Sequence, residues 1–398
     1  MGSLKKLGII GVLDSAIWSV ASHPNDRIIA SCGSSIVIWM DKQLKGHKWY
    51  QEIEIINKRS MAGNSWVKAY EFGNLEHNRL IRKIAWSPCG DMIISASFDS
   101  SISVWEFVSK DIGWSCICKI LGPESEVKCV DWSPFNNFVA ACCRDRAIWF
   151  FSLDIGEKRE LGTLIEYDCI GVVTAHTNDI KKIKWHPTIP MVLLSCSYDN
   201  TIIVWSPSFQ LLGHDEVKGL EWVKLYTLNG HSSTVWDFTY SPNGEFLLSC
   251  SDDSSIVLWN NDQGNENKFK NLSSVNFALS DTFKMIFYNT MNARKLSKYI
   301  QIDQANSFIN NYDKELYSYP IYSIEWCSYI NCIIVSSADK SLHLFSVTDS
   351  KKLKHICEKA NAHSSEINSV SWLNDNKKGE FISAGDDGEI ALWRFDFE

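Results

Sequence analysis

Short segments in which apolar and polar residues alternate recur along most of the chain. Clear examples are IRKIAW at 81–86, VKCVDW at 127–132 and INSVSW at 367–372. Alternation with a period of two is typical of half-buried β-strands, and no segment of helical length shows the 3.6-residue period of an amphipathic helix. The pattern therefore predicts an all-β protein.

Each of these strands ends in an aromatic residue, and a second aromatic follows after a turn, a short apolar strand and a turn aspartate. The clearest copies of the segment that ends in this second aromatic are SASFDSSISVW, SCSYDNTIIVW, SCSDDSSIVLW and SAGDDGEIALW, which end at Trp105, Trp205, Trp259 and Trp393. Weaker copies end at Trp39, where Gly33 replaces the aspartate, and at Phe151 and Phe345. The chain thus contains seven related units.

Seven units with a period of about 45 residues and a closing Trp predict the blades of a β-propeller. A four-stranded blade cannot bury both faces alone, so the blades pack around an axis and the ring must close. We expect residues 4–12 to supply the outer strand of the last blade. The chain, 1–398, is then a single domain with insertions at 43–75, 206–222 and 260–315, where the period is broken.

Composition supports a folded protein and restricts its partners. The chain has 398 residues, of which 45% are hydrophobic, and 17 tryptophans, enough for an extended core. Its net charge of −8 argues against nucleic-acid and anionic-membrane partners, because both bind clustered Lys and Arg. No apolar stretch approaches the length of a membrane-spanning helix.

Thirteen cysteines raise the question of a metal or disulfide site. Cys142, Cys196 and Cys250 lie three residues before a turn aspartate, where other units have Ala or Ser, so they are expected to be small packing residues. Cys116 and Cys118 lie on one alternating strand, with both thiols expected on the same face, but no second pair accompanies them. We expect no metal site and no cofactor. An odd number of cysteines without a secretory signal points to a reducing compartment.

Four units carry His, Ser, Asp and Trp at the same spacing. In a hydrogen-bonded tetrad the Asp would accept from the imidazole, the Ser hydroxyl would pass the bond on, and the indole N–H would end it. The four sets are His77, Ser95, Asp99 and Trp105; His176, Ser195, Asp199 and Trp205; His231, Ser249, Asp253 and Trp259; and His363, Ser383, Asp387 and Trp393. Because the set occurs four times, it indicates a structural role in each blade and not a hydrolase site. The Gly-x-Ser-x-Gly motif of hydrolases does not occur in the sequence. We predict that the protein is not an enzyme.

The third unit departs from this set. Pro123 stands in place of the histidine and Phe151 in place of the tryptophan, so Asp145 lacks both partners. Its blade is expected to be either weaker or held by other contacts.

Two positions vary between units while the scaffold repeats, and both are expected at the rim of the central channel. The residue before the turn aspartate and a residue on the inner strand provide Phe98, Arg144, Tyr198, Asp252, Arg82, Lys128, Lys181 and Trp236. The second to fourth units thus form a cationic, aromatic half and the later units an acidic half. This surface suits an anionic peptide that bears an aromatic, such as a carboxylate terminus beside Trp or Phe. Taken singly, each position is equally compatible with a solvated turn residue.

Several segments resemble one family. IRKIAWSPCGDMIISASFDSSISVW, RDRAIW, HTNDIKKIKWHP and STVW are similar to segments of the WD-repeat subunit of the cytosolic iron-sulfur protein assembly (CIA) machinery, over most of 77–260 and the last blade. The resemblance implies a seven-bladed WD40 β-propeller that serves as a scaffold of the targeting complex. It implies partners, namely a small acidic subunit, a helical-repeat adaptor and apo client proteins that await iron-sulfur clusters. It also implies a cytoplasmic location and leaves a nuclear one open.

The resemblance carries over to particular residues. The family's functionally important arginine in the third blade matches Arg144, and Arg82, Lys128, Lys181 and Trp236 match by motif. The alternative is a generic WD40 adaptor of a ubiquitin ligase or a chromatin complex. Cullin adaptors of this type usually carry Trp-Asp-x-Arg at blade ends, a motif that none of the four clearest units contains.

Overall fold

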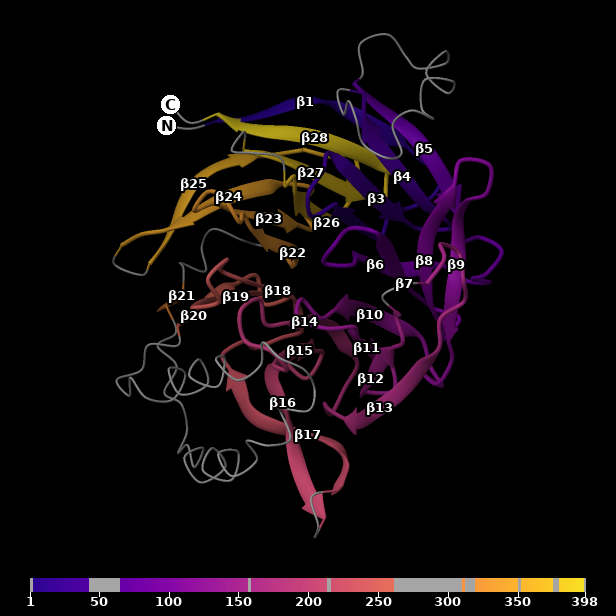
Figure 1. Ribbon diagram of the computed structural model, residues 1–398. Coiled ribbons are helices and arrows are strands. Elements are labelled where there is room, and N and C mark those ends of the chain that lie inside the picture. The colour runs from indigo at the N-terminus through magenta and orange to yellow at the C-terminus, as the bar shows by residue number, and fades with distance from the viewer. Residues whose placement is uncertain are drawn as a thin grey trace.

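The computed structural model describes residues 3–42, 65–156, 159–212, 216–260, 310–311, 319–349, 352–374 and 379–396. All the regular secondary-structure elements in these ranges are β-strands. The strands form seven four-stranded antiparallel sheets arranged in a ring (Figure 1). None of the described segments forms a helix long and apolar enough to cross a membrane. The predicted seven-bladed β-propeller is confirmed.

The first four blades each use four consecutive strands, ordered from the channel outward. The first contains β2 (Ser19–Ser22), β3 (Ile28–Cys32), β4 (Ile36–Asp41) and β5 (Trp66–Phe72). The second contains β6 (Ile81–Trp86), β7 (Met92–Ser97), β8 (Ile102–Ser109) and β9 (Gly113–Ile120). The third contains β10 (Val127–Trp132), β11 (Phe138–Cys143), β12 (Ala147–Leu153) and β13 (Tyr167–Thr174). The fourth contains β14 (Ile180–Trp185), β15 (Leu193–Ser197), β16 (Thr201–Leu212) and β17 (Glu216–Asn229).

The last three blades follow the same order, and the seventh borrows its outer strand from the start of the chain. The fifth contains β18 (Val235–Tyr240), β19 (Phe246–Ser251), β20 (Ile256–Asn260) and β21 (Asn310–Asn311). The sixth contains β22 (Ile321–Trp326), β23 (Ile333–Ser337), β24 (Leu342–Val347) and β25 (Leu353–Lys359). The seventh contains β26 (Ile367–Trp372), β27 (Glu380–Gly385), β28 (Glu389–Asp396) and β1 (Ser3–Val12).

The ring closes in the seventh blade, as predicted. β1 pairs antiparallel with β28 along its length, so the two chain ends lie side by side (Figure 1). The ammonium group of Lys6 forms an ion pair with the Glu389 carboxylate. It also lies 5.5 Å from the centre of the Trp393 ring. The first and last strands are therefore joined by backbone hydrogen bonds and by side chains.

Parts of the predicted insertions are regular blade structure. Residues 66–72, within the predicted insertion at 43–75, form the outer strand of the first blade, and 43–64 lie outside the described residues. Residues 206–222 belong largely to β16 and β17, which pair as one long hairpin. Of 260–315, most lies outside the described residues, and 310–311 form β21.

The aromatic residue at the end of an inner strand connects neighbouring blades. Trp86 Nε1 donates a hydrogen bond to the carbonyl of Ala21 at 3.1 Å, and Trp372 Nε1 does so to that of Glu325 at 3.1 Å. Trp185 Nε1 reaches the carbonyl of Asp131 at 3.3 Å. Each indole thus fills apolar space between two blades while its polar N–H remains satisfied.

The cysteines follow the predicted packing role with one correction. Cys142, Cys196 and Cys250 are fully buried. Cys116 and Cys118, however, pack on opposite faces of their blade, because the register of β8 with β9 shifts between Trp105 and Val104. A β-bulge at this point breaks the alternation on which the expectation of a shared face rested.

Candidate functional site

The inner strands carry a β-bulge at their second residue in six blades. The register shifts between Ile81 and Lys83 in the second blade and at the same position in the five that follow. A bulge leaves one residue unpaired and redirects its side chain. The unpaired residues are Arg82, Lys128, Lys181, Trp236, Tyr322 and Asn368. They occupy the variable inner-strand position that the sequence identified.

The second variable position lies in a turn that the aspartate holds. Asp99 Oδ1 accepts a hydrogen bond from the backbone N–H of Ser101 at 2.9 Å, and Ser100 between them has a φ of 68°. The backbone N–H of the preceding residue, Phe98, donates to the carbonyl of Leu80 at 3.0 Å. Phe98 is thereby fixed beside the start of the inner strand. The corresponding bonds of Arg144, Tyr198 and Asp252 to the loop before their inner strand measure 2.9–3.0 Å.

Cations and aromatic rings from neighbouring blades meet at this rim. Lys128 Nζ lies 4.4 Å from the centre of the Phe98 ring, and the Arg82 guanidinium lies 5.0 Å from that of Trp18. The rings of Trp18 and Phe98 are 6.4 Å apart in an edge-to-face arrangement. Cation–π contacts of this kind hold the rings and the cations against one another.

Lys181 lies between two aromatic rings in the adjoining blades. Its Nζ is 3.6 Å from the centre of the Tyr198 ring and 4.8 Å from that of Trp236. Burial, reinforced by the positive charges of Lys128 and Arg82, lowers the pKa of Lys181 to about 8. The three cations are thus close enough to repel one another, and an anion bound among them would relieve that repulsion.

Glu126 and Arg79 belong to the same cluster, although sequence reasoning missed them. Glu126 Oε2 accepts a hydrogen bond from Lys128 Nζ at 2.5 Å, and Glu126 Oε1 accepts one from Arg79 Nη2 at 3.0 Å. The hydrogen bond from Lys128 lowers the pKa of Glu126 and keeps it charged. Both residues lie in loops just before inner strands, outside the two variable positions. The side chain of Arg144 remains 64% exposed and lies 4.0 Å from Glu126 Oε1.

The opposite part of the rim is acidic. Asp252 accepts a hydrogen bond from Ser233 Oγ at 3.1 Å, and Asp386 accepts one from Asn368 Nδ2 at 2.7 Å. Burial, together with Glu366, Asp252 and Asp386, raises the pKa of Tyr322 to about 12. The rings of Tyr322 and Trp236 pack edge-to-face with their centres 5.3 Å apart. The cationic and acidic parts of the rim are therefore in contact through these two rings.

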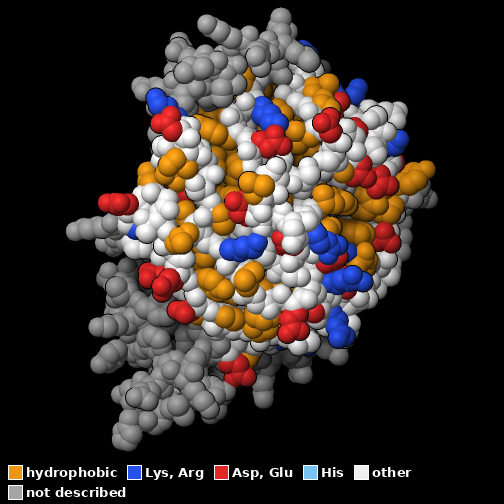
Figure 2. All heavy atoms as spheres, turned by 90° about the vertical axis from the view of Figure 1, so that its right-hand side faces the viewer, with side chains coloured by type: hydrophobic (Ala, Val, Ile, Leu, Met, Phe, Trp, Pro, Cys, Tyr) orange, Lys and Arg blue, Asp and Glu red, His pale blue; other side chains and the backbone are white. Residues whose placement is uncertain are grey.

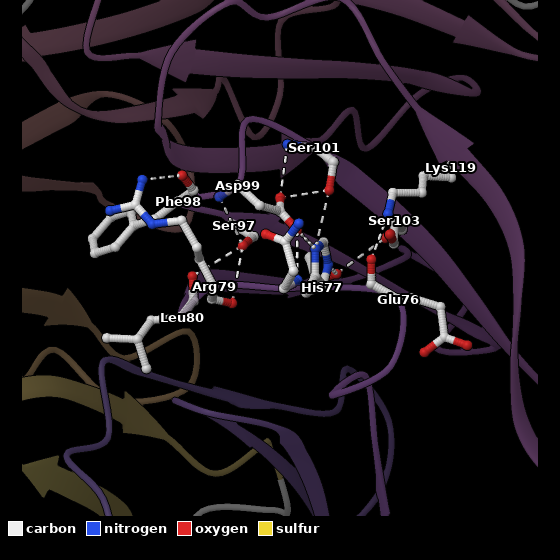
Figure 3. A network of polar contacts seen from close by, with 12 residues as sticks. Glu76, His77, Arg79, Leu80, Ser97, Phe98, Asp99, Ser101, Ser103 and Lys119 are labelled. Carbon is white, nitrogen blue, oxygen red and sulfur yellow. Dashed lines mark hydrogen bonds and ion pairs between the residues drawn. The ribbon is translucent and has the colours of Figure 1, made fainter.

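The four predicted tetrads assemble in the blades. In the second blade, His77 Nδ1 lies 3.2 Å from Asp99 Oδ2 (Figure 3). The Nε2 of His77 lies 2.8 Å from Ser95 Oγ. Trp105 Nε1 donates to the same hydroxyl at 2.8 Å. The fourth, fifth and seventh blades repeat this arrangement. The four serines are fully buried, so none of these hydroxyls can reach a substrate.

The third blade is held by other contacts. Asp145 Oδ1 accepts from the N–H of Ala147 at 3.0 Å, and the N–H of Asp145 donates to Ser125 Oγ at 2.9 Å. Phe151 is fully buried and packs edge-to-face on Tyr167 at 6.0 Å. Aromatic packing thus replaces the missing tetrad.

The side of the ring that carries β5, β9 and β13 faces the viewer in Figure 2. Basic, acidic and apolar side chains are interspersed over this face (Figure 2). Ile112, Leu121 and Val172, which lie at or beside β9 and β13, are exposed. The rim, where cations and aromatic rings of neighbouring blades meet, is the candidate binding site.

Comparison with known proteins identifies a repeat family. The family described as WD domain, G-beta repeat, matches residues 8–47, 71–106, 114–152, 167–206, 222–260 and 353–394. These six matches fall on six blades, and β22–β24 of the sixth blade lie outside them.

Several curated proteins are similar to the chain over nearly all of its length. A "Probable cytosolic Fe-S cluster assembly factor" of Schizosaccharomyces japonicus is 28% identical over 381 residues, which cover 95% of this chain and 51% of that protein. A "Probable cytosolic iron-sulfur protein assembly protein 1" of Candida albicans is 26% identical over 95% of this chain and 96% of its own length. A "Probable cytosolic iron-sulfur protein assembly protein CIAO1 homolog" of Caenorhabditis elegans is 28% identical over 96% and 95%. The chain spans about half the length of the Schizosaccharomyces relative and nearly the whole of the other two.

Proposed function

This chain belongs to the WD40-repeat family, and from that premise we propose that it is a non-catalytic scaffold of cytosolic iron-sulfur protein assembly. In this role it docks partner subunits and presents apo client proteins for late insertion of their clusters. The names of its relatives, which refer to cytosolic iron-sulfur protein assembly, support the process and the cytosolic location. The proposed partner subunits are a small acidic protein and a helical-repeat adaptor.

The observation that carries the binding role is the convergence of cations and aromatic rings at the rim. Lys128 lies over Phe98, and Lys181 lies over Tyr198 and Trp236. Arg144 is the most exposed of the predicted cations, and its only described ion pair is at 4.0 Å. An anionic peptide segment with an aromatic side chain would gain charge-assisted hydrogen bonds from the cations and stacking from the rings.

The proposal is tested by affinity purification of the tagged full chain with identification of the bound proteins. We expect the wild-type chain to recover iron-sulfur assembly subunits and apo iron-sulfur proteins. Arg144→Glu is expected to lose clients because it places a carboxylate where an anionic peptide would bind. A second measurement, anisotropy of a labelled peptide with a carboxylate terminus after Trp, should show at least about tenfold weaker binding by the variant.

Arg146→Glu is the matched control. Arg146 is also exposed, lies two residues further on and makes no side-chain contact with the rim cluster among the interactions described here. It should bind like the wild type. Equal recovery of clients by wild type and Arg144→Glu, with unchanged circular dichroism, would exclude the rim as the client site. Recovery of cullin or chromatin subunits in place of iron-sulfur proteins would instead identify a generic WD40 adaptor.

A further inference from the structure

Two histidines and a glutamate meet on the outer half of the sixth blade, on β24 and β25. His343 pairs with Glu358, and Phe345 pairs with His355. Between these pairs the register shifts, so β25 contains one extra residue. Residues 355 and 358 are three positions apart and would face opposite sides of a regular strand. The β-bulge brings both to the face that carries His343.

The ligand atoms of these three residues are close together. One atom from each side chain can be chosen so that all three lie within 4.8 Å of one another. His343 Nδ1 is 3.7 Å from Glu358 Oε2, and the two imidazole centres are 5.7 Å apart. Tetrahedral Zn²⁺ with bonds of about 2.0–2.2 Å needs ligand atoms roughly 3.3 Å apart. The Glu358 side chain is 60% exposed and can rotate to close this gap.

Hydrogen bonds orient the ring of His343 for such a role. The Ser341 hydroxyl donates to Asp339 Oδ1, so its oxygen is free to accept the proton of His343 Nε2 at 2.6 Å. The lone pair of His343 then lies on Nδ1, the nitrogen that faces Glu358. Metal-ligating histidines usually donate their second N–H to a polar partner in this way.

His355 supplies the second nitrogen. Its Nε2 is buried and makes no hydrogen bond within the described part of the chain. A buried polar nitrogen without a partner costs free energy, which a metal bond would offset.

We propose that His343, His355 and Glu358 bind a first-row divalent metal ion of the Zn²⁺ class, with water in the remaining position. Two imidazoles and one carboxylate without a thiolate suit this class of ion. Cys357 pairs with Leu344 and lies on the other face of the strand, so it does not contribute. The ion joins β24 to β25 in a blade where Phe345 replaces the tetrad tryptophan.

The test is a titration of the full chain with Co²⁺ after removal of metal by a chelator. We expect one equivalent to bind with d–d absorption in the visible and without the near-ultraviolet charge-transfer band of thiolate ligands. Zn²⁺ should displace the Co²⁺ and raise the midpoint of thermal unfolding. His355→Gln and Glu358→Gln should each weaken Co²⁺ binding by at least about tenfold. Glu245→Gln, the same change at an exposed carboxylate in the fifth blade, should have no effect.

Either of two results would overturn the assignment. One is Co²⁺ affinity in His355→Gln and Glu358→Gln equal to that of wild type. The other is a thiolate band with the first equivalent, which would place the metal on cysteines. Because the Glu358 side chain is largely exposed, Glu358→Gln should fold normally, and circular dichroism of the metal-free variants checks this.

Discussion

A single buried hydroxyl explains how a tetrad holds its blade. Ser249 Oγ receives the indole N–H of Trp259 at 2.8 Å and lies 2.7 Å from Nε2 of His231. His231 in turn contacts Asp253 at 3.2 Å. His231 lies in the loop before β18, Ser249 on β19, Asp253 in the turn after β19 and Trp259 on β20, so one chain of polar contacts ties that loop and the turn to the two middle strands. Each member satisfies the next, and losing one leaves another unpaired.

Asp253→Ala should therefore destabilise the protein by about 1–3 kcal/mol, because His231 and the turn lose their acceptor in a buried setting. Chemical unfolding monitored by circular dichroism measures the change. The control is Asp252→Ala, which removes an adjacent but exposed carboxylate and should leave stability close to that of wild type. Equal stability of the two variants would show that the tetrad contributes nothing.

Acid should abolish the difference between wild type and Asp253→Ala. Burial alone would raise the pKa of Asp253, but hydrogen bonds from His231, Ser255 and Ser232 outweigh it and lower the pKa well below its usual range. Such a carboxyl stabilises the fold fully above its unfolded-state pKa of about 3.9 and loses that contribution as the pH falls further. The stability gap should therefore be complete near neutral pH and narrow below about pH 4. A gap of the same size in acid would contradict this.

β-Bulges decide which side chains meet on the strands of this propeller. On the inner strands they leave Arg82, Lys128 and Lys181 unpaired, at the rim. On the outer strands they separate Cys116 from Cys118 and bring His355 to the side of His343. One extra residue thus either creates or removes a potential site.

The closing strand offers a direct test of packing between elements. A Cβ on Gly11 of β1 would lie 2.1 Å from Trp39 Cη2, whereas a Cβ on Gly8 of the same strand would contact nothing within 4 Å. Gly11→Ala should overpack the junction of the first and last blades and cost about 1–3 kcal/mol. Gly8→Ala should change stability by no more than about 0.5 kcal/mol. Urea unfolding of both variants measures this, and equal midpoints would argue against the close approach of β1 to Trp39.

At the scale of the whole molecule, the ring brings together residues that are distant in sequence. Trp18, Phe98, Tyr198 and Trp236 come from four blades and line one rim with the cations between them. Each of these blades contributes one or two side chains to the candidate site, and the scaffold fixes their positions.

The charge of this rim should depend on pH through Lys181. Because the pKa of Lys181 is lowered to about 8, its ammonium is charged at neutral pH and loses its proton above that value. If the rim binds an anionic peptide, the affinity should fall by about tenfold between roughly pH 7 and pH 9. Lys181→Arg should flatten this dependence, since a guanidinium stays charged. Anisotropy of the same labelled peptide measures both, and an unchanged slope in Lys181→Arg would assign the titration to another group.

The sequence predicted the features that depend on fixed chemistry at a fixed spacing. His231 and Trp259 could be placed because a tetrad needs those residue types, and the rim cations could be found because they vary within a constant scaffold. Glu126 was missed because its loop carries no periodic pattern. The approach of His355 to His343 and the separation of Cys116 from Cys118 depend on bulges, which leave no mark on residue composition.

The pairing of β1 with β28 also has a consequence during synthesis. The ribosome releases β1 before β28, so the outer strand of the seventh blade is separated from the other three by the synthesis of the six blades between them. Until then β1 has an unpaired edge, and no complete seventh blade joins the sixth blade to the first. The ring is completed only when β28 has left the ribosome and pairs with β1. A nascent chain that stops short of β28 is therefore an open arc, with two exposed ends for chaperones to protect.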